Sequence, residues 1–389
     1  MIKKIKQLTE SAFDEIVEIR RHIHRNPELS FKEHKTSAYI KSVLTSWGVS
    51  FTEDIADTGI VVLLEGKYPK SKTLALRADF DALPITEKND IVYCSVNNGI
   101  MHACGHDAHT ASMLGALKIL NTLKDEWQGT IKCVFQPAEE MLPGGAQQMI
   151  KEEVLENPKV EKMIGQHVFP DLEVGKVGFC SGKYMASTDE LHITINGKGG
   201  HAALPEKYNN PLLAAAKLIL DLESSFVHDK EIPSVFAIGF IEGLGSTNVI
   251  PDKVRLKGTL RAMDEDFRAV AHKRMQKIAL DVAKYYELEI DFDIRIGYPS
   301  LVNDVSLTES AIVFAKEYLG SENVIDLPMR MTAEDFAYYS HKVPSCFYRL
   351  GTRNEQKGIV HGLHTSRFNI DEQSLKIGMG LMAYLAIKS

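Results

Sequence analysis

The first part of the chain alternates between amphipathic stretches and short apolar runs. Residues 9–25 place Phe13, Ile16 and Val17 on one helical face, and this pattern ends before Pro27. Apolar runs predict buried strands over 59–66, 73–81, 130–135 and 162–165. Helical spacing between them predicts helices over 33–47, 111–123 and 146–155. Such alternation with short connections indicates a mostly parallel sheet with helices on both faces.

The pattern changes near residue 183, where polar and apolar residues begin to alternate as in half-exposed strands. The predicted order is strand, helix, strand, strand, helix, strand, over 190–196, 212–222, 234–240, 253–261, 265–285 and 288–296. This is the order of a ferredoxin-like sandwich. We therefore expect an α/β first domain formed by residues 1–182 and 298–389, with a ferredoxin-like α+β domain inserted over 183–297. An apolar helix after Asp371 closes the first domain.

Composition narrows the classes of function. A chain of 389 residues is longer than one hydrophobic core usually fills, which supports two domains. The net charge of −7 argues against a nucleic-acid or anionic-membrane partner, and no run of residues has the apolar length of a membrane span. The cysteines are few, odd in number and widely spaced, which is typical of free thiols in a reducing compartment. We expect a cytoplasmic protein.

Residues 101–110, MHACGHDAHT, concentrate a thiol, three imidazoles and a carboxylate at the start of a predicted helix. Cys104 and His106 lie two positions apart, and a thiolate and a neutral imidazole are ligands for Zn²⁺ or a similar divalent ion. A buried free cysteine beside surface histidines is the alternative. The density of ligand types favours metal binding, and we predict that Cys104 and His106 begin a two-metal hydrolytic site.

Other candidates stand where predicted strands end. Glu139 and Glu140 follow the strand over 130–135, and adjacent carboxylates there point in different directions. One can bind a metal while its neighbour acts as general base on a water, although a solvated surface pair is the alternative. His167 ends another strand and His364 lies in a glycine-containing loop, so each is either a ligand or an ordinary structural histidine.

The inserted domain and the last part of the chain add three candidates. His201 follows the glycine-rich stretch GKGG, and Asn248 lies in TNVIP. Neither has metal-ligand spacing, and both are otherwise ordinary loop residues. A functional role would require them to donate hydrogen bonds to a developing oxyanion or a substrate carboxylate. Asp335 could orient a ligand, or could simply begin a helix.

Taken together, these motifs resemble one family from end to end. The family comprises metal-dependent amidohydrolases that include bacterial aminoacylases, hippurate hydrolases, N-acetyldiaminopimelate deacetylases and plant auxin-conjugate hydrolases. The matching stretches are RHIHRNPELS (21–30), LRADFDALP (76–84), MHACGHD (101–107), FQPAEE (135–140), GKGGHAA (197–203), NVIP (248–251) and EDF (334–336). Broader relatives carry a ligand histidine where this chain has Arg77, so the resemblance is to members with a thiolate ligand.

The resemblance implies a role for each candidate. It implies two divalent ions (Mn²⁺, Zn²⁺, Co²⁺ or Ni²⁺) held by Cys104, His106, Glu140, His167 and His364. Cys104 is then the bridge between the ions, and His102 and His109 are structural or support the ligands. It also implies that Glu139 is the general base.

The same resemblance implies roles for the inserted domain and for partners. His201 and Asn248 become lid-domain groups that bind the substrate or its oxyanion, and the lid pairs two chains as a homodimer. The implied substrate is a small N-acyl amino acid, whose amide bond is hydrolysed.

Three alternatives remain open at the level of the sequence. The first is a non-catalytic protein that keeps the fold and binds metal or an amino-acid conjugate. The second is a cysteine hydrolase that uses Cys104 and His106, which would survive chelation of metals. The third is an aminopeptidase or carboxypeptidase that acts on small peptides with the same fold.

Overall fold

The computed structural model describes residues 1–226 and 232–389, which form two compact units. The first unit comprises residues 1–182, 302–328 and 335–389, and the second comprises 183–301 and 329–334. Residues 298–301 and 329–334 therefore group with the second unit, whereas the predicted boundaries assign them to the first domain. None of the helices in the described ranges combines the length and the apolar content that a membrane span requires.

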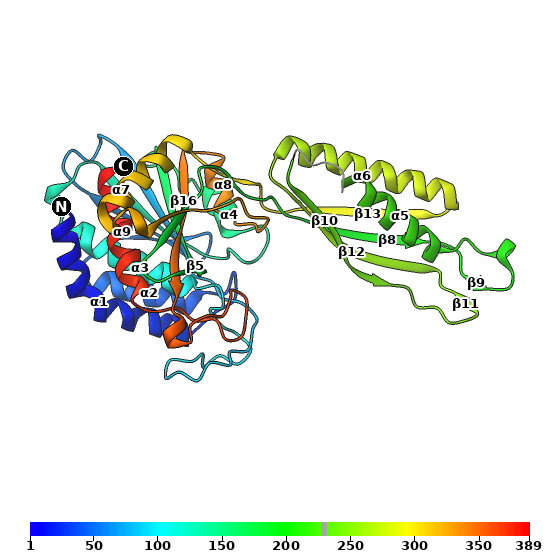
Figure 1. Ribbon diagram of the computed structural model, residues 1–389, viewed down its shortest axis with the longest axis horizontal. Coiled ribbons are helices and arrows are strands. Elements are labelled where there is room, and N and C mark those ends of the chain that lie inside the picture. Colours follow the sequence, from blue (N-terminus) through cyan, green and yellow to red (C-terminus); the bar gives the residue numbers. More distant parts are fainter. Residues whose placement is uncertain (227–231) are drawn as a thin grey trace. The chain divides into compact units, whose positions relative to one another are not determined.

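An eight-stranded sheet forms the centre of the first unit (Figure 1). Its order is β1 (Thr52–Ile55), β2 (Gly59–Glu65), β4 (Thr130–Gln136), β3 (Thr73–Asp79), β5 (Lys162–Glu173), β16 (Ser345–Arg353), β6 (Val177–Phe179) and β15 (Val324–Asp326). The central strands β4, β3, β5 and β16 run parallel to one another, and β6 and β15 are also parallel. Antiparallel pairing is confined to β1 with β2, β2 with β4 and β16 with β6. This confirms the predicted α/β class with a mainly parallel sheet.

Helices cover both faces of this sheet. The helices of the unit are α1 (Ile2–Arg25), α2 (His34–Ser46), α3 (His106–Thr122), α4 (Gly145–Lys151), α7 (Val305–Leu319), α8 (Ala337–Ser340) and α9 (Ser374–Lys388). Successive side chains of a strand point to opposite sides, so the residues of β16 contribute in turn to the two faces of the sheet. Cys346 and Tyr348 join the core under α1, α3 and α9, whereas Phe347 stacks on Phe336 beside α8, with ring centroids 4.9 Å apart.

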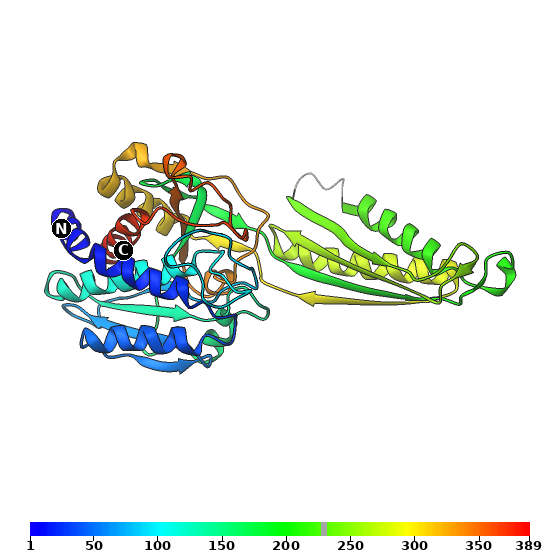
Figure 2. The ribbon, with the colours of Figure 1, turned by 90° about the horizontal axis from the view of Figure 1, so that it is seen from below.

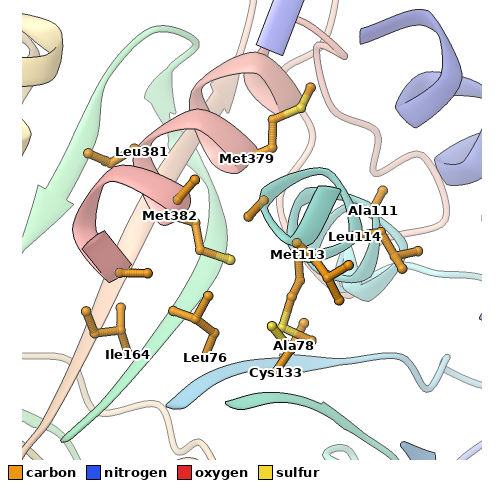
Figure 3. Close-up of a cluster of buried hydrophobic side chains, with 14 of the residues drawn as sticks. Leu76, Ala78, Ala111, Met113, Leu114, Cys133, Ile164, Met379, Leu381 and Met382 are labelled. Carbon is orange, nitrogen blue, oxygen red and sulfur yellow. The ribbon is translucent and has the colours of Figure 1, made fainter. Parts of the chain in front are cut away.

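The larger core lies between the sheet and the pair α3 and α9 (Figure 3). Met382 of α9 lies over Leu76 of β3 and Ile164 of β5, whereas Met113 of α3 lies over Ala78 of β3 and Cys133 of β4, and all of these side chains are buried. The two helices approach closely at Gly115, where an added Cβ would lie 2.7 Å from Sδ of Met379. This packing fixes α3 over the central parallel strands, with its first residues at the ends of those strands.

The second unit has the predicted ferredoxin-like element order (Figure 2). Its elements are β8 (Asp189–Asn196), α5 (Pro211–Phe226), β10 (Ser234–Glu242), β12 (Lys253–Ala262), α6 (Glu265–Tyr286) and β13 (Glu289–Ile296). The four strands form an antiparallel sheet in the order β10-β12-β8-β13. Leu191, Ile193 and Ile195 of β8 face a core shared with α5 and α6, as the polar–apolar alternation predicts.

Short elements complete the fold. The remaining strands are β7 (Gly182–Met185), β9 (Gly200–His201), β11 (Val249–Ile250) and β14 (Leu301–Asn303). The single-turn 3₁₀ helices in the described ranges are η1 (Lys124–Glu126), η2 (Pro205–Lys207), η3 (Ser321–Asn323) and η4 (Glu355–Lys357).

Candidate metal centre

A left-handed glycine shapes the start of α3. Gly105 has φ of 84°, and a Cβ added there would lie 2.5 Å from Cγ2 of Val168. Glycine adopts this conformation at little cost and leaves room for the valine. The tight turn places Cys104 and His106 on either side of it, and both side chains are buried.

The structure brings six of the predicted site residues together at the ends of the central strands. Their ligand atoms form overlapping groups in which all atoms lie within 4.8 Å of one another. Cys104 belongs to two such groups, one with His106 and His167 and one with Glu140 and His364. Glu139 forms a third group with His106 and Glu140. A thiol shared by two groups is in the position that a bridging ligand would need.

Neighbouring potential ligand atoms of this cluster lie 3.2 to 4.0 Å apart. Sγ of Cys104 lies 3.5 Å from Nε2 of His167. Nε2 of His364 lies 3.2 Å from Oε1 of Glu140. Nε2 of His106 lies 3.8 Å from Oε1 of Glu140 and 4.0 Å from Oε2 of Glu139.

Two of the histidines are oriented by the backbone. The ring of His167 donates from Nδ1 to the carbonyl oxygen of Val168 at 2.7 Å, which leaves Nε2 facing Cys104. His364 is half exposed and has φ of 59°, and its N–H donates to the carbonyl oxygen of Ala103 at 2.8 Å. This hydrogen bond holds the loop that contains His364 next to Ala103, the residue before Cys104.

Asp81 orients His106, a role that the sequence alone does not assign. Oδ1 of Asp81 lies 3.0 Å from Nδ1 of His106, and Oδ2 accepts from Oγ of Ser30 at 2.7 Å and from the N–H of Glu140 at 3.0 Å. Such carboxylate–histidine pairs fix the ring and the tautomer of a metal ligand. The signal in the sequence is the position of Asp81 directly after a buried strand.

The donor set fits a divalent cation. Among the described residues, Nε2 of His106 has no hydrogen-bond partner, although it is buried. Burial disfavours the charged ring, but Asp79, Asp81 and Glu140 outweigh it and raise the pKa of His106 to about 10. The surroundings of this nitrogen therefore favour positive charge strongly. A thiol, imidazoles and carboxylates in this arrangement suit Zn²⁺, Mn²⁺ and similar ions.

His109 and His102 lie outside this donor set. Nδ1 of His109 lies 2.5 Å from Oδ1 of Asp79, and its Nε2 accepts from the N–H of Val168 at 2.9 Å. Both ring nitrogens are thus engaged. His102 is buried, and burial lowers the pKa of its ring to about 4, so it is neutral.

A buried ion network holds the residues behind the site. Arg77 donates to Oδ2 of Asp79 at 2.6 Å, to Oδ1 of Asp335 at 2.7 Å and to Oε1 of Gln136 at 2.9 Å. Asp335 also accepts from the N–H of Ala146 at 3.0 Å. Asp335 is thus linked to the centre through Arg77 and Asp79. Its role in orienting a metal ligand stays a prediction.

His201 and Asn248 lie beside each other in the second unit. The short strands β9 and β11 pair His201 with Val249, and the N–H of Ala202 donates to the carbonyl oxygen of Asn248 at 3.0 Å. Both side chains are exposed. These two candidates therefore lie on neighbouring strands of this unit.

Comparison with known proteins defines the family. The model of the peptidase family M20/M25/M40 matches residues 75–388. This match spans most of the chain, so the protein belongs to that family, as the sequence motifs predict.

Similar proteins cover nearly the whole chain. Thermostable carboxypeptidase 2 of Saccharolobus solfataricus is 36% identical over 395 residues, which cover 100% of this chain and 98% of that relative. N-acetyl-L-cysteine deacetylase of Bacillus subtilis is 36% identical over 364 residues, covering 93% and 85%. The crystal structure of the YXEP protein of Bacillus subtilis, described as a dinuclear metal-binding peptidase, superposes with a TM-score of 0.84 at 32% identity and covers 97% of this chain and 98% of that one.

Proposed function

We propose that this protein hydrolyses the amide bond of N-acyl amino acids at a centre that holds two divalent ions. The observation that carries the proposal is the cluster in which Cys104 is shared by two groups of potential ligands. Its relationship to a deacetylase that acts on an N-acyl amino acid and to a dinuclear metal-binding peptidase supports both parts of the proposal.

Five residues would hold the ions, namely Cys104, His106, Glu140, His167 and His364. When bound, divalent ions lower the pKa of a water and polarise the scissile carbonyl. Asp81 keeps His106 turned toward the cluster, and the carbonyl of Val168 does the same for His167. The ligands are therefore held in place by groups that do not themselves bind the ions.

Glu139 is the proposed general base. The side chain of Glu139 is 8% exposed, and its Oε2 lies 4.0 Å from Nε2 of His106, beside the cluster. It takes a proton from the attacking water and returns it to the leaving amine, so that amide and water become a carboxylate and a free amino acid. Oε1 of Glu140, the next residue, lies 3.2 Å from Nε2 of His364 and 3.8 Å from Nε2 of His106, between two proposed ligands. Adjacent carboxylates thus divide the roles of base and ligand.

Replacement of the base tests this assignment. Glu139→Gln keeps the size of the side chain but cannot accept the proton, so turnover of N-acetyl and N-benzoyl amino acids should fall by roughly 10²-fold or more. Its metal content should equal that of the wild type. We would measure kcat, together with metal by elemental analysis. A Glu139→Gln enzyme with near-normal turnover would refute the assignment.

Hydrolysis of short peptides is the second candidate. A thermostable carboxypeptidase is as similar to this chain as the deacetylase is. Both substrate classes present an amide next to an amino acid, so the same centre can serve either. Dipeptides and N-acyl amino acids with the same C-terminal residue, assayed side by side, separate the two by kcat/KM.

The buried, acidic surroundings of Cys104 do not favour a cysteine nucleophile. Burial, followed by the charges of Glu140 and Glu139, raises the pKa of the Cys104 thiol well above its ordinary value. A cysteine nucleophile needs the opposite shift, because the thiolate is the reactive form. The two carboxylates would instead favour a cation beside the sulfur.

A further inference from the structure

The segment Glu28–Glu33 has no role in the chemistry described above, yet it lies against the centre. Leu29 forms a parallel bridge with Ala82, and the N–H of Ala82 donates to the carbonyl oxygen of Glu28 at 2.8 Å. The segment therefore extends alongside the residues that follow β3. Ser30 and Glu33 are both buried, with 5% and 0% of their surface exposed.

Ser30 contacts the residue that orients His106. Its Oγ donates to Oδ2 of Asp81 at 2.7 Å, and the same oxygen accepts from the N–H of Glu140. Oδ1 of Asp81 faces Nδ1 of His106. One hydroxyl thus completes the set of hydrogen bonds that fixes this carboxylate between two proposed ligands.

Glu33 contacts the turn that carries the general base. Its Oε1 accepts from the N–H of Ala138 at 2.9 Å, and its Oε2 accepts from Oγ1 of Thr58 at 3.3 Å. Ala138 is buried and has φ of 54°, a left-handed conformation that costs an alanine roughly 1–2 kcal/mol. The N–H of Gly145 closes the same turn by donating to the carbonyl oxygen of Ala138 at 2.9 Å.

These contacts explain why an unfavourable conformation persists directly before Glu139. Without an acceptor, the N–H of Ala138 would be buried and unpaired, which disfavours the turn further. A carboxylate aimed at that N–H makes the left-handed turn the stable arrangement. The direction of the Glu139 side chain follows from this turn.

We propose that the segment 28–33 is a positioning device for the catalytic centre, with Glu33 holding the Ala138 turn before the general base and Ser30 holding Asp81. This inference rests on the proposed function for its effect on catalysis, but not for its effect on the turn itself. Ser30 and Glu33 are positioning residues, since they act through Asp81 and Ala138.

Variants of Glu33 test the positioning of the base. Glu33→Ala removes the acceptor, so kcat for an N-acetyl amino acid should fall by roughly 10- to 100-fold, with KM little changed and Mn²⁺ saturating. Glu33→Gln keeps an amide oxygen for Ala138 and should retain most of kcat. Ser30→Ala, a milder change, should reduce kcat less than Glu33→Ala. A Glu33→Gln variant as impaired as Glu33→Ala would overturn the proposal.

Thr36→Val provides the matched control. Oγ1 of Thr36 and its N–H both donate to Oε2 of Glu28, at 2.9 and 2.8 Å, whereas Ala138 is bound by Glu33. Thr36→Val should lower the melting temperature without changing kcat. Equal losses of kcat in Thr36→Val and Glu33→Ala would show that the segment acts through general stability only, and would contradict positioning.

Amide hydrogen exchange makes the test independent of any activity. In Glu33→Ala the N–H of Ala138 should exchange roughly tenfold faster or more, while in Glu33→Gln and Thr36→Val it should exchange as in the wild type. Unchanged exchange at Ala138 in Glu33→Ala would overturn the proposal. If the wild type hydrolyses no acylated amino acid, the proposed function fails, and the exchange data still decide whether Glu33 holds the turn.

Discussion

At the scale of the residue, two buried carboxyl groups near the centre have opposite pKa shifts. Burial, together with the charge of Asp81, raises the pKa of Glu33 to about 7. Burial acts in the same direction on Asp81, but hydrogen bonds with His106, Glu140 and Ser30 outweigh it and hold its pKa below the ordinary value. The number and charge of the partners, and not the depth of burial, decide which carboxyl is ionised.

The raised pKa of Glu33 predicts a pH-dependent stability difference. In the range from the ordinary value of 4.5 to about 7, the folded state binds the proton more tightly than the unfolded state, so Glu33 lowers stability progressively as pH rises. Glu33→Gln lacks this loss. Its melting temperature, measured with EDTA throughout, should exceed that of the wild type at pH 8 by more than at pH 5. A difference that is constant between the two pH values would contradict the prediction.

At the scale of the element, the turn before α3 determines whether its first residues can form the centre. Gly105 and Gly48 both have positive φ, of 84° and 66°, but an added Cβ meets Val168 at Gly105 and no atom within 4 Å at Gly48. A side chain added at either position therefore has a similar backbone cost. Of the two, only a side chain at Gly105 would also collide with Val168, beside the proposed ligands.

Alanine at the two glycines should separate these effects. Gly48→Ala should lower stability by roughly 1 kcal/mol and leave metal binding unchanged. Gly105→Ala should lower stability further and weaken metal binding, because relief of the contact with Val168 moves Cys104 and His106. Thermal unfolding and metal titration of both variants provide the check. Wild-type metal affinity in Gly105→Ala would show that the ligands tolerate a different turn.

Much of the element order could be predicted from periodicity, because most strands and helices have one clear period. The expected helix over 265–285 corresponds to α6 (Glu265–Tyr286), and the expected strand over 130–135 to β4 (Thr130–Gln136). Strand β16 (Ser345–Arg353) was not predicted. It is central and buried on both faces, but Arg349 and polar residues interrupt its apolar run, so it lacks both the alternation and the continuity that mark a strand.

The site divides in a similar way. Ligand chemistry and spacing brought Cys104 and His106 into the prediction. Positions at the ends of strands brought in Glu139, Glu140 and His167, and the family resemblance then assigned the roles. The sequence did not predict the positioning roles of Asp81, Ser30 and Glu33. Each of these residues acts through a partner far away in sequence, such as Ala138 for Glu33. Long-range pairing of this kind leaves no local periodic signal.

At the scale of the whole molecule, the candidate site residues are divided between two compact units. The proposed ligands and the proposed base lie in the first unit, and His201 and Asn248 lie in the second. The roles of these two residues, and the pairing of two chains through the second unit, are proposals. The resemblance of the sequence motifs implies that this unit supplies such groups to the substrate, which makes His201 the residue to test first.

Removal of one oxyanion donor typically lowers kcat by roughly 10²-fold or more, and we predict this effect for His201→Ala. His192→Ala is the matched control, since His192 lies in the same unit and its ring contacts only Glu190 among the described ion pairs. The control should keep the wild-type kcat, and both variants should bind metal normally. If His201→Ala turns over as fast as His192→Ala, the assigned role is wrong.

The most direct measurement is hydrolysis of an N-acetyl amino acid as metal is removed and restored. The enzyme is stripped with EDTA, dialysed, and titrated with Mn²⁺ while turnover and bound metal are followed together. We predict no turnover in the stripped protein. As Mn²⁺ is added, turnover should rise and reach its plateau at about two ions per chain. Turnover that survives chelation, or that never appears at any metal load, would contradict it.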